Sequence, residues 1–303
     1  MKWTPGGSSD DIEDRRDEGG GGGGFRFGGF GGAHLGLGGT LVVVVLSIIF
    51  RSNLFTGGVP LATHAPDTAR DASEQNEVEF VKFVLNDVQA NWDKLLPQSG
   101  ARYRHATLVL FRDETQSGCG EAQSATGPFY CPQDEKVYLD LGFFDELKTR
   151  FGAPGEFAQA YVIAHEIGHH VQKLLGIEGK VRRLQRLEPS AGNRLSVGLE
   201  LQADCFAGIW ANSTEQRKLI NQDDISAGLR AAAAVGDDRL QRKATGRVSP
   251  ESFTHGSSAQ RMSWFKSGLD AGRISACKHI RTARALIQGG HSVLQVRIGS
   301  VGV

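Results

Sequence analysis

The chain has 303 residues, no net formal charge at pH 7, 40% hydrophobic residues and 22% charged residues. This balance is typical of a globular protein, and it excludes a nucleic-acid binder driven by phosphate neutralisation and a wholly disordered acidic chain. The length is sufficient to bury a sizeable core.

The first 32 residues are charged and then rich in glycine. A mostly charged run from Asp10 to Glu18 is followed by the glycines that begin at Gly19. Such a segment buries too little apolar surface to offset the entropy lost on folding, so we predict that residues 1–32 are disordered. The Gly-x-Gly-x-x-Gly matches within it follow no predicted strand, and we do not interpret them as a nucleotide site.

An uncharged apolar stretch runs from Ala33 to Phe50 and is closed by Arg51. As a helix it would be about 27 Å long, close to the ~30 Å hydrocarbon core of a bilayer. The alternatives are a buried core segment, which has no evident neighbour to pack on, and a cleaved signal peptide, which would have an unusually long charged head. We predict one transmembrane helix at 33–50 and a linker at 51–75.

The charges and cysteines around this stretch indicate its orientation. More Lys and Arg residues precede it than follow it closely, which weakly favours a cytoplasmic N-terminus. All the cysteines follow it, as expected in an oxidising compartment, and they are Cys119, Cys131, Cys205 and Cys277. Four cysteines allow three pairings; we expect a local Cys119–Cys131 bridge, which leaves Cys205 with Cys277. The sequence thus predicts a single-pass protein of the cell membrane whose folded part is extracytoplasmic.

Residues 76–277 have the pattern of one α+β domain, with strands first and helices dominating later. The expected helices are 78–96 (ended by Pro97), 157–175, 195–210 and 224–235, and the expected strands are 106–111 and 137–141. Residues 278–303 form a C-terminal tail of unknown role.

A metal-binding pattern lies inside the 157–175 helix. His165 and His169 are four residues apart, so they lie on one helical face and can bind one metal ion. Glu166 is rotated by about 100° from His165, so it can reach a water on the metal without being a ligand. A pair of structural histidines is the alternative. We interpret His170 as a supporting or exposed residue.

A third ligand is expected from the 195–210 helix. Glu200 and Asp204 are also four residues apart, and carboxylates on an otherwise apolar helix are costly to bury unless a positive charge meets them. We assign Glu200 as the ligand and Asp204 as the acceptor that orients a ligating imidazole. Asp204 as the ligand, a Cys205 thiolate, and a solvated helix face remain alternatives.

Longer sequence strings around these residues resemble a family of bacterial neutral zinc metallopeptidases with a single membrane span. The matching strings are Met1-Lys-Trp, Asp11 to Arg16, Gly118-Cys-Gly120, Gly127 to Pro132, Val137 to Leu141, Gln159 to Gln172, Glu200 to Gly208, Phe253 to Gly256 and Gln260-Arg261. The resemblance implies a zincin-like fold, a Zn²⁺ cofactor and a glutamate as third ligand. It carries over to His165, Glu166, His169 and Glu200.

The chemistry expected of this site is hydrolysis of a peptide or protein substrate. Glu166 would act as general base toward a zinc-activated water. A further donor would stabilise the oxyanion, with His255 first, Tyr138 second and Arg261 third. Strand 137–141 would pair as an edge with an extended substrate.

Two other functions are compatible with the sequence. One is a non-catalytic zinc-binding scaffold of the cell envelope, although the intact Glu166 argues against it. The other is a membrane protein whose glycine-rich tail is an interaction segment.

Overall fold

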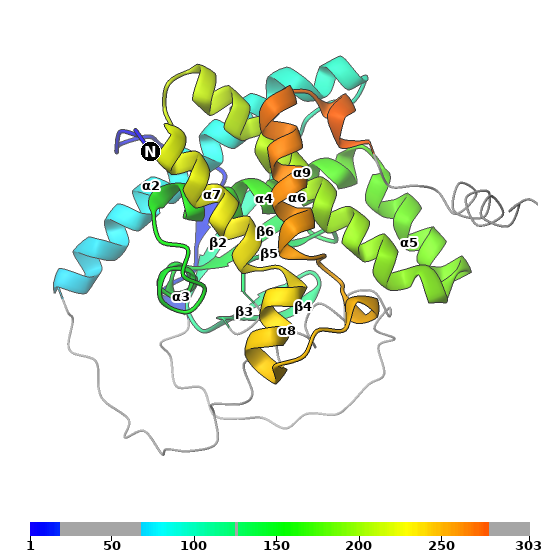
Figure 1. The fold of residues 1–303 in the computed structure, drawn as a ribbon. Helices are drawn as coiled ribbons and strands as arrows, with labels where there is room; N and C mark the ends of the chain where they lie inside the picture. The colour runs from blue at the N-terminus through cyan, green and yellow to red at the C-terminus, as the bar shows by residue number, and fades with distance from the viewer. Residues whose placement is uncertain (19–67, 125–126, 279–303) are drawn as a thin grey trace, which may run out of the picture.

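The computed structural model describes residues 1–18, 68–124 and 127–278, which form a mixed α+β fold (Figure 1). The predicted membrane helix at 33–50, the glycine-rich part of the tail at 19–32 and the C-terminal tail from residue 279 lie outside the described residues. Within the described ranges, no helix combines the length and the apolar character that crossing a bilayer requires.

A four-stranded sheet lies behind the helices in Figure 1, in the order β1-β2-β6-β5. The strands are β1 Ile12–Asp14, β2 Thr107–Phe111, β5 Phe129–Cys131 and β6 Lys136–Asp140. The first three in this order are parallel, and β5 runs antiparallel to β6. A separate ribbon contains β3 Glu114–Ser117 and β4 Gly120–Gln123.

The two predicted strands are confirmed as β2 and β6, but the predicted edge position of 137–141 is wrong. β6 is paired on both sides, with β2 and with β5. The tight connection between Cys131 and Lys136 folds β5 back onto β6, so β5 is the edge strand on this side of the sheet.

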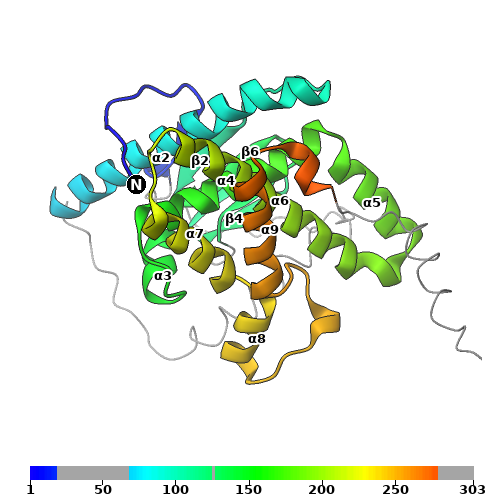
Figure 2. The same ribbon diagram turned by 45° about the horizontal axis from the view of Figure 1, so that its top comes forward.

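The N-terminal residues 1–18 are folded, which corrects the prediction of disorder for this part of the tail. The segment lies beside α2 (Figure 2), and its strand β1 pairs with β2. The Trp3 ring packs against Phe80 with ring centroids 5.3 Å apart. The charged side chains are compensated by partners, since Glu13 accepts from Lys136 at 2.6 Å. The sequence pattern hides this segment because Glu13 and Arg16 also pair with residues far away in the chain, Lys136 and Glu74.

This pairing bears on the single crossing predicted for residues 33–50. The α-amino group of Met1 forms an ion pair with Asp224 at 2.8 Å, so residues before and after that stretch belong to one folded unit. One crossing between residues 18 and 68 would place hydrogen-bonded strands on opposite sides of a bilayer. The sheet therefore requires residues 18 and 68 to lie on the same side of any membrane.

Eight α-helices are described. They are α2 Thr68–Leu95, α3 Gly142–Thr149, α4 Glu156–Leu174, α5 Ile177–Leu187, α6 Gly192–Gln216, α7 Gln222–Ala234, α8 Asp237–Thr245 and α9 Ser258–Ala271. The four predicted helices are confirmed as α2, α4, α6 and α7. α2 begins at Thr68, inside the predicted linker, and α6 extends beyond the predicted 195–210 at both ends.

Helix α4 lies at the centre of the core and packs closely on α6. A Cβ atom at Gly168 would lie 3.0 Å from the Ala203 carbonyl oxygen, so the glycine allows the two helices to approach. On the other side of α6, a Cβ atom at Gly268 of α9 would lie 1.9 Å from the Cys205 carbonyl oxygen. This close packing sets the distance between the histidines of α4 and the carboxylates of α6.

Both predicted disulfides are confirmed. Cys119–Cys131 joins the β3–β4 turn to the edge strand β5, with a Cα–Cα distance of 5.8 Å. Cys205–Cys277 joins α6 to the end of the described chain, also at 5.8 Å. The second bond excludes Cys205 as a thiolate ligand.

Candidate metal centre

His165 and His169 of α4 and Glu200 of α6 converge as the sequence predicts. One ligand atom from each residue lies within 4.8 Å of the others. The carboxylate oxygens of Glu200 are 3.2 Å from His165 Nε2 and 3.4 Å from His169 Nε2. Two imidazole nitrogens and a carboxylate form a donor set that zinc prefers in hydrolytic sites.

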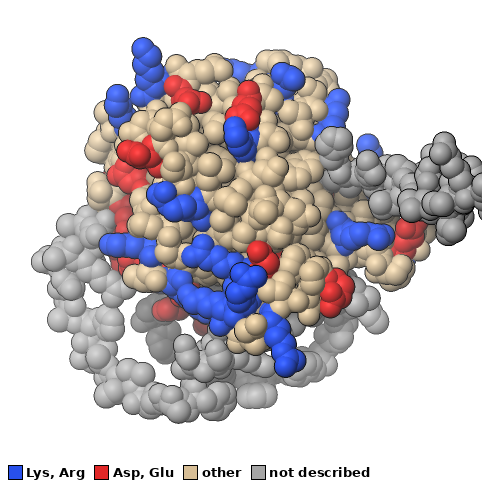
Figure 3. Space-filling view, viewed as in Figure 1, with Lys and Arg blue, Asp and Glu red and all other residues tan. Residues whose placement is uncertain are grey.

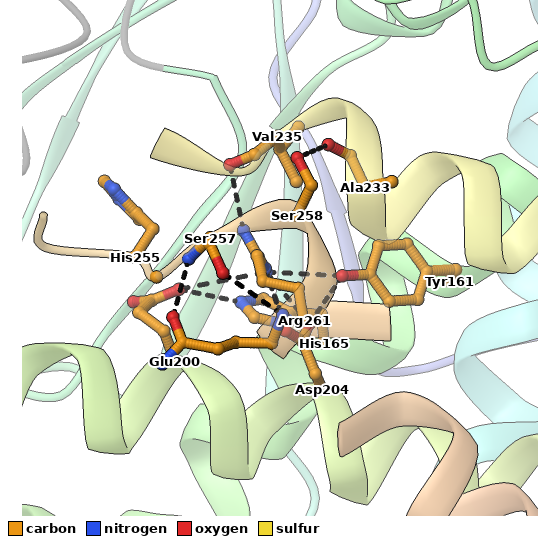
Figure 4. A network of polar contacts seen from close by, with 12 residues as sticks. Tyr161, His165, Glu200, Asp204, Ala233, Val235, His255, Ser257, Ser258 and Arg261 are labelled. Atoms are coloured by element: carbon orange, nitrogen blue, oxygen red, sulfur yellow. Dashed lines mark hydrogen bonds and ion pairs between the residues drawn. The ribbon is translucent and has the colours of Figure 1, made fainter. Parts of the chain in front are cut away.

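Asp204 holds the outer nitrogen of His165. Its Oδ1 is 2.9 Å from His165 Nδ1, so Nδ1–H donates to Asp204 and Nε2 faces Glu200 (Figure 4). Asp204 also accepts two hydrogen bonds from Arg261, at 2.8 and 2.9 Å, and one from the Tyr161 hydroxyl. These contacts occupy both oxygens, so Asp204 orients a ligand and is not itself the third ligand.

The charge balance of the cluster favours a cation between the imidazoles. Burial raises the pKa of Asp204, but Arg261 and His165 lower it below its ordinary value. Burial also raises the pKa of Glu200, and the two histidines lower it well below the ordinary value. Burial lowers the pKa of His165, but Asp204 and Glu200 together raise it to about 10. The two ionised carboxylates therefore stabilise positive charge at His165, which fits a bound metal ion.

His169 is oriented by an amide that the sequence analysis missed. Its Nδ1 lies 2.9 Å from Gln172 Oε1, so the imidazole N–H donates and Nε2 remains a ligand atom. The Gln172 amide nitrogen donates to the Leu199 carbonyl at 2.7 Å and to Gln202 at 3.1 Å, which fixes the amide. The sequence does indicate this contact, because Gln172 follows His169 by about one helical turn and so lies on the same face of the helix.

Glu166 is buried and lines the same cavity as the histidines. Burial raises the pKa of its carboxyl to about 7, with His165 lowering it and Glu200 raising it. The backbone of Tyr130, in the edge strand β5, also lowers the pKa of this carboxyl. A carboxyl poised near neutrality can both accept and return a proton.

His255 lies at the cavity, in the loop before α9. Asp237, at the start of α8, builds this loop, since one oxygen accepts the backbone N–H groups of Thr254, His255 and Gly256 at 2.7, 2.7 and 3.0 Å. Its other oxygen is 3.1 Å from His255 Nδ1. Asp237 was missed because its partners are loop residues whose approach no periodicity indicates.

Tyr138 is not brought to the site. Its hydroxyl donates to Asp134 at 2.7 Å, and its ring stacks on Phe129. Val137 and Leu139 face the main core, so the alternation of a strand turns Tyr138 to the opposite face of the sheet. Arg261 does line the cavity, but its guanidinium is held by Asp204 and is 4.0 Å from Glu200.

His170 is buried, which excludes the exposed alternative. Its Nε2–H donates to the Arg104 carbonyl at 2.7 Å, and the Tyr130 hydroxyl donates to its Nδ1 at 3.0 Å. Burial lowers the pKa of His170. As a neutral imidazole it joins the metal-binding helix to the edge strand.

The cavity has a volume of about 270 Å³, and its lining includes an apolar and a polar set of residues, here called its apolar end and its polar end. The apolar end is formed by Phe143, Phe151, Val162, Val235 and Leu240. The polar end is formed by Glu178, Arg182, Gln185 and Ser196 of α5 and α6. Val162 precedes His165 by one helical turn, whereas α5 follows the C-terminal end of α4 (Figure 1), so the two sets are reached from different ends of α4.

Comparison with known proteins supports a zinc-binding interpretation. A family model described as "Putative neutral zinc metallopeptidase" matches residues 1–280. The uncharacterized protein YpfJ of Escherichia coli K12 is 46% identical over 248 residues, covering 80% of this chain and 86% of the relative. The uncharacterized protein Rv2575 of Mycobacterium tuberculosis H37Rv is 45% identical over 203 residues, covering 63% of this chain and 67% of the relative. No solved structure matches the chain.

Proposed function

This chain belongs to the family of neutral zinc metallopeptidases, and we propose that it is a zinc-dependent peptidase that hydrolyses peptide bonds with Glu166 as general base. The observation that carries the proposal is the convergence of His165, His169 and Glu200, with Glu166 beside them in one cavity. A structural zinc site needs no buried carboxyl with a raised pKa next to its ligands.

A zinc ion held by these three side chains would supply positive charge that activates water and polarises the substrate carbonyl. Glu166 accepts the proton of the attacking water. From the same position Glu166 can return that proton to the leaving amine. Asp204 and Gln172 keep both imidazoles in the ligating tautomer.

His255 is the proposed donor to the oxyanion. Burial lowers the pKa of its imidazole, but the hydrogen bond to Asp237 and the charge of Glu200 raise it above the ordinary value. The raised pKa favours the imidazolium form, which would stabilise negative charge that develops on the substrate carbonyl oxygen. Asp237 acts as a positioning residue for this group.

The edge strand β5 is the proposed binding site for the substrate backbone. Phe129 and Tyr130 of β5 line the cavity, and β5 ends the sheet on this side. An extended peptide can add to such an edge by main-chain hydrogen bonds. β5 thus replaces strand 137–141, which the sequence had indicated as the edge that pairs with the substrate.

We further propose that the apolar stretch at 33–50 holds the peptidase at the cell membrane and that the folded part acts outside the cytoplasm. Two disulfides within the described residues support an oxidising compartment. The folded N-terminal segment requires residues 1–18 to lie on the same side as the peptidase domain.

The proposed activity is tested by comparing the wild type with Glu166→Gln, using unlabelled casein and zinc-loaded, full-length protein. Loss of a general base is expected to lower kcat by about 10²–10⁴-fold. Zinc content and the thermal unfolding midpoint should remain those of the wild type. Casein cleavage by Glu166→Gln at the wild-type rate, or no cleavage of a peptide library by the zinc-loaded wild type, would refute the peptidase function.

A further inference from the structure

A group of basic side chains, here called the α8 basic surface, lies outside the apolar end of the cavity. Its members are Arg150, Arg239, Arg242, Lys243 and Arg247. In Figure 3, blue atoms gather over the lower part of this face, where Figure 1 places α8. The whole chain has no net formal charge, so this concentration of cations is a local feature.

The same segments form the rim and the wall of the cavity. Leu240 of α8 and Phe151 line the apolar end, while their neighbours in sequence are basic. Arg239 donates to the Phe151 carbonyl at 3.0 Å, and the Arg150 guanidinium carbon is 5.9 Å from the Phe151 ring centroid. The α8 basic surface therefore borders the residues of the apolar end directly.

Stabilisation of the C-terminal end of α8 explains only some of these basic residues. Arg242 and Lys243 lie in the last turn of α8, where cations interact favourably with the helix dipole. Arg150 comes from another segment, however, and Arg247 follows the end of the helix.

The acidic residues of α8 are engaged elsewhere. Asp237 accepts backbone N–H groups of the His255 loop, and Asp238 accepts from Ser258 at 2.7 Å. Arg150 is compensated in part by Glu146 at 3.8 Å. The positive charge beside the cavity therefore comes mainly from the exposed Arg239, Arg242, Lys243 and Arg247.

We propose that the α8 basic surface binds acidic side chains of the substrate polypeptide, next to an apolar substrate side chain held in the cavity. The inference rests on the proposed peptidase function and names its substrate class: polypeptides with an apolar residue at the cleavage site and Asp or Glu residues nearby on the same side. Complementary charge at the rim adds specificity and speeds association.

Binding is measured separately from turnover, on zinc-loaded, full-length Glu166→Gln protein in detergent. Two fluorescein-labelled peptides share an apolar core, and one carries Glu on both flanks where the other carries Gln. Fluorescence anisotropy at low salt is expected to give the acidic peptide a Kd about tenfold lower. The preference should shrink at roughly 0.5 M NaCl, because exposed charges are screened over a few ångströms there.

Three double variants in this background locate the preference, and two of them are matched in charge. Arg242→Glu with Arg247→Glu should abolish it, and the milder Arg242→Gln with Arg247→Gln should reduce it with unchanged thermal unfolding. Lys94→Glu with Arg102→Glu changes exposed residues outside the cavity lining by the same total charge, and should keep it.

Equal binding of the two peptides by the parent protein would overturn the proposal, and so would a preference that survives Arg242→Glu with Arg247→Glu. If this variant instead lost binding to vesicles of anionic phospholipid and kept the peptide preference, the surface would belong to a membrane contact and the proposal would be wrong. A protein that prefers the acidic peptide but cleaves neither casein nor the peptide library would reject the peptidase function alone.

Discussion

At the scale of single residues, the outer ring nitrogens of His165 and His169 are both held by partners from α4 and α6, the helices that carry the proposed ligands. Asp204 fixes His165, and Gln172 fixes His169, each with a hydrogen bond of 2.9 Å. Such partners fix the ligating tautomer before the metal arrives, which lowers the cost of binding. The buried Arg261 balances the charge of Asp204 without entering the donor set.

The contact between Asp237 and His255 predicts a pH effect. Because the pKa of His255 lies above its ordinary value, activity that needs the imidazolium is lost only as the pH rises through that raised pKa. Asp237→Asn removes a cause of the increase, so the alkaline limb of the kcat/KM profile should move to lower pH. The acidic limb should change little. An unchanged alkaline limb, with zinc content and folding intact, would contradict the role of His255.

The residues of this site differ in how far sequence predicts them. His165, Glu166 and His169 follow from helical spacing alone, and Glu200 and Asp204 from a second spacing of the same kind. Tyr161 and Asp237 escape such reasoning because they act through partners brought close by the fold. The assignment of Tyr138 fails because the pattern that identifies a strand does not say which face meets the metal.

At the scale of elements, the N-terminal segment that contains β1 is attached by a buried amide and an ion pair. The Gln89 side chain of α2 donates to Asp11 at 2.8 Å and accepts the Ala106 N–H at 2.7 Å. His105 lies between two carboxylates, 2.6 Å from Asp11 and 2.9 Å from Asp93. These contacts join β1, α2 and β2, three elements separated in the chain.

His105 is expected to make this attachment pH-dependent. Partial burial lowers its pKa, but the hydrogen bonds to Asp93 and Asp11 raise it above the ordinary value. A raised folded-state pKa contributes stability that is complete below the unfolded value of about 6.5 and is lost as pH rises through the folded value. Urea unfolding at pH 5.5 and pH 9 should show a larger cost of His105→Asn at pH 5.5, at most ~1 kcal/mol for a part-exposed pair.

A neighbouring substitution provides the control for this measurement. Arg102→Gln changes an exposed residue and should cost the same at both values of pH. A cost of His105→Asn that is equal at the two values, or larger at pH 9, would contradict the ion-pair account.

Long, periodic elements are the ones that sequence predicts. α4 and α6 bury continuous apolar faces, and β2 and β6 are rich in β-branched and aromatic residues. β1 and β5 have three residues each, too few for a period to be recognised. Their positions depend on neighbouring strands and on the Cys119–Cys131 bond, so only the folded structure reveals them.

At the scale of the whole molecule, the fold determines how the chain can be arranged at a membrane. The parallel pairing of β1 with β2 joins residues that precede the apolar stretch at 33–50 to residues that follow it. The charge bias of the sequence alone favoured opposite sides. Hydrogen bonds of a mixed sheet are a stronger constraint than a small excess of Lys and Arg.

Labelling in intact cells tests this arrangement. Asp17→Cys and Lys266→Cys each introduce an exposed thiol, one before and one after the apolar stretch. We expect a membrane-impermeant maleimide to label both from outside the cell, and neither to require permeabilisation. Labelling of Lys266→Cys alone would show that the chain crosses the membrane once, and would contradict the pairing of β1 with the domain.

Three side chains are proposed to bind one zinc ion, and metal content measures this directly. Purified wild-type protein should hold about one zinc per chain after gel filtration. Glu200→Ala should lose most of it, Asp204→Asn should bind it about 10–100-fold more weakly, and Glu178→Ala, which removes another cavity carboxylate, should match the wild type. Zinc held by Glu200→Ala as tightly as by the wild type would contradict the proposed centre.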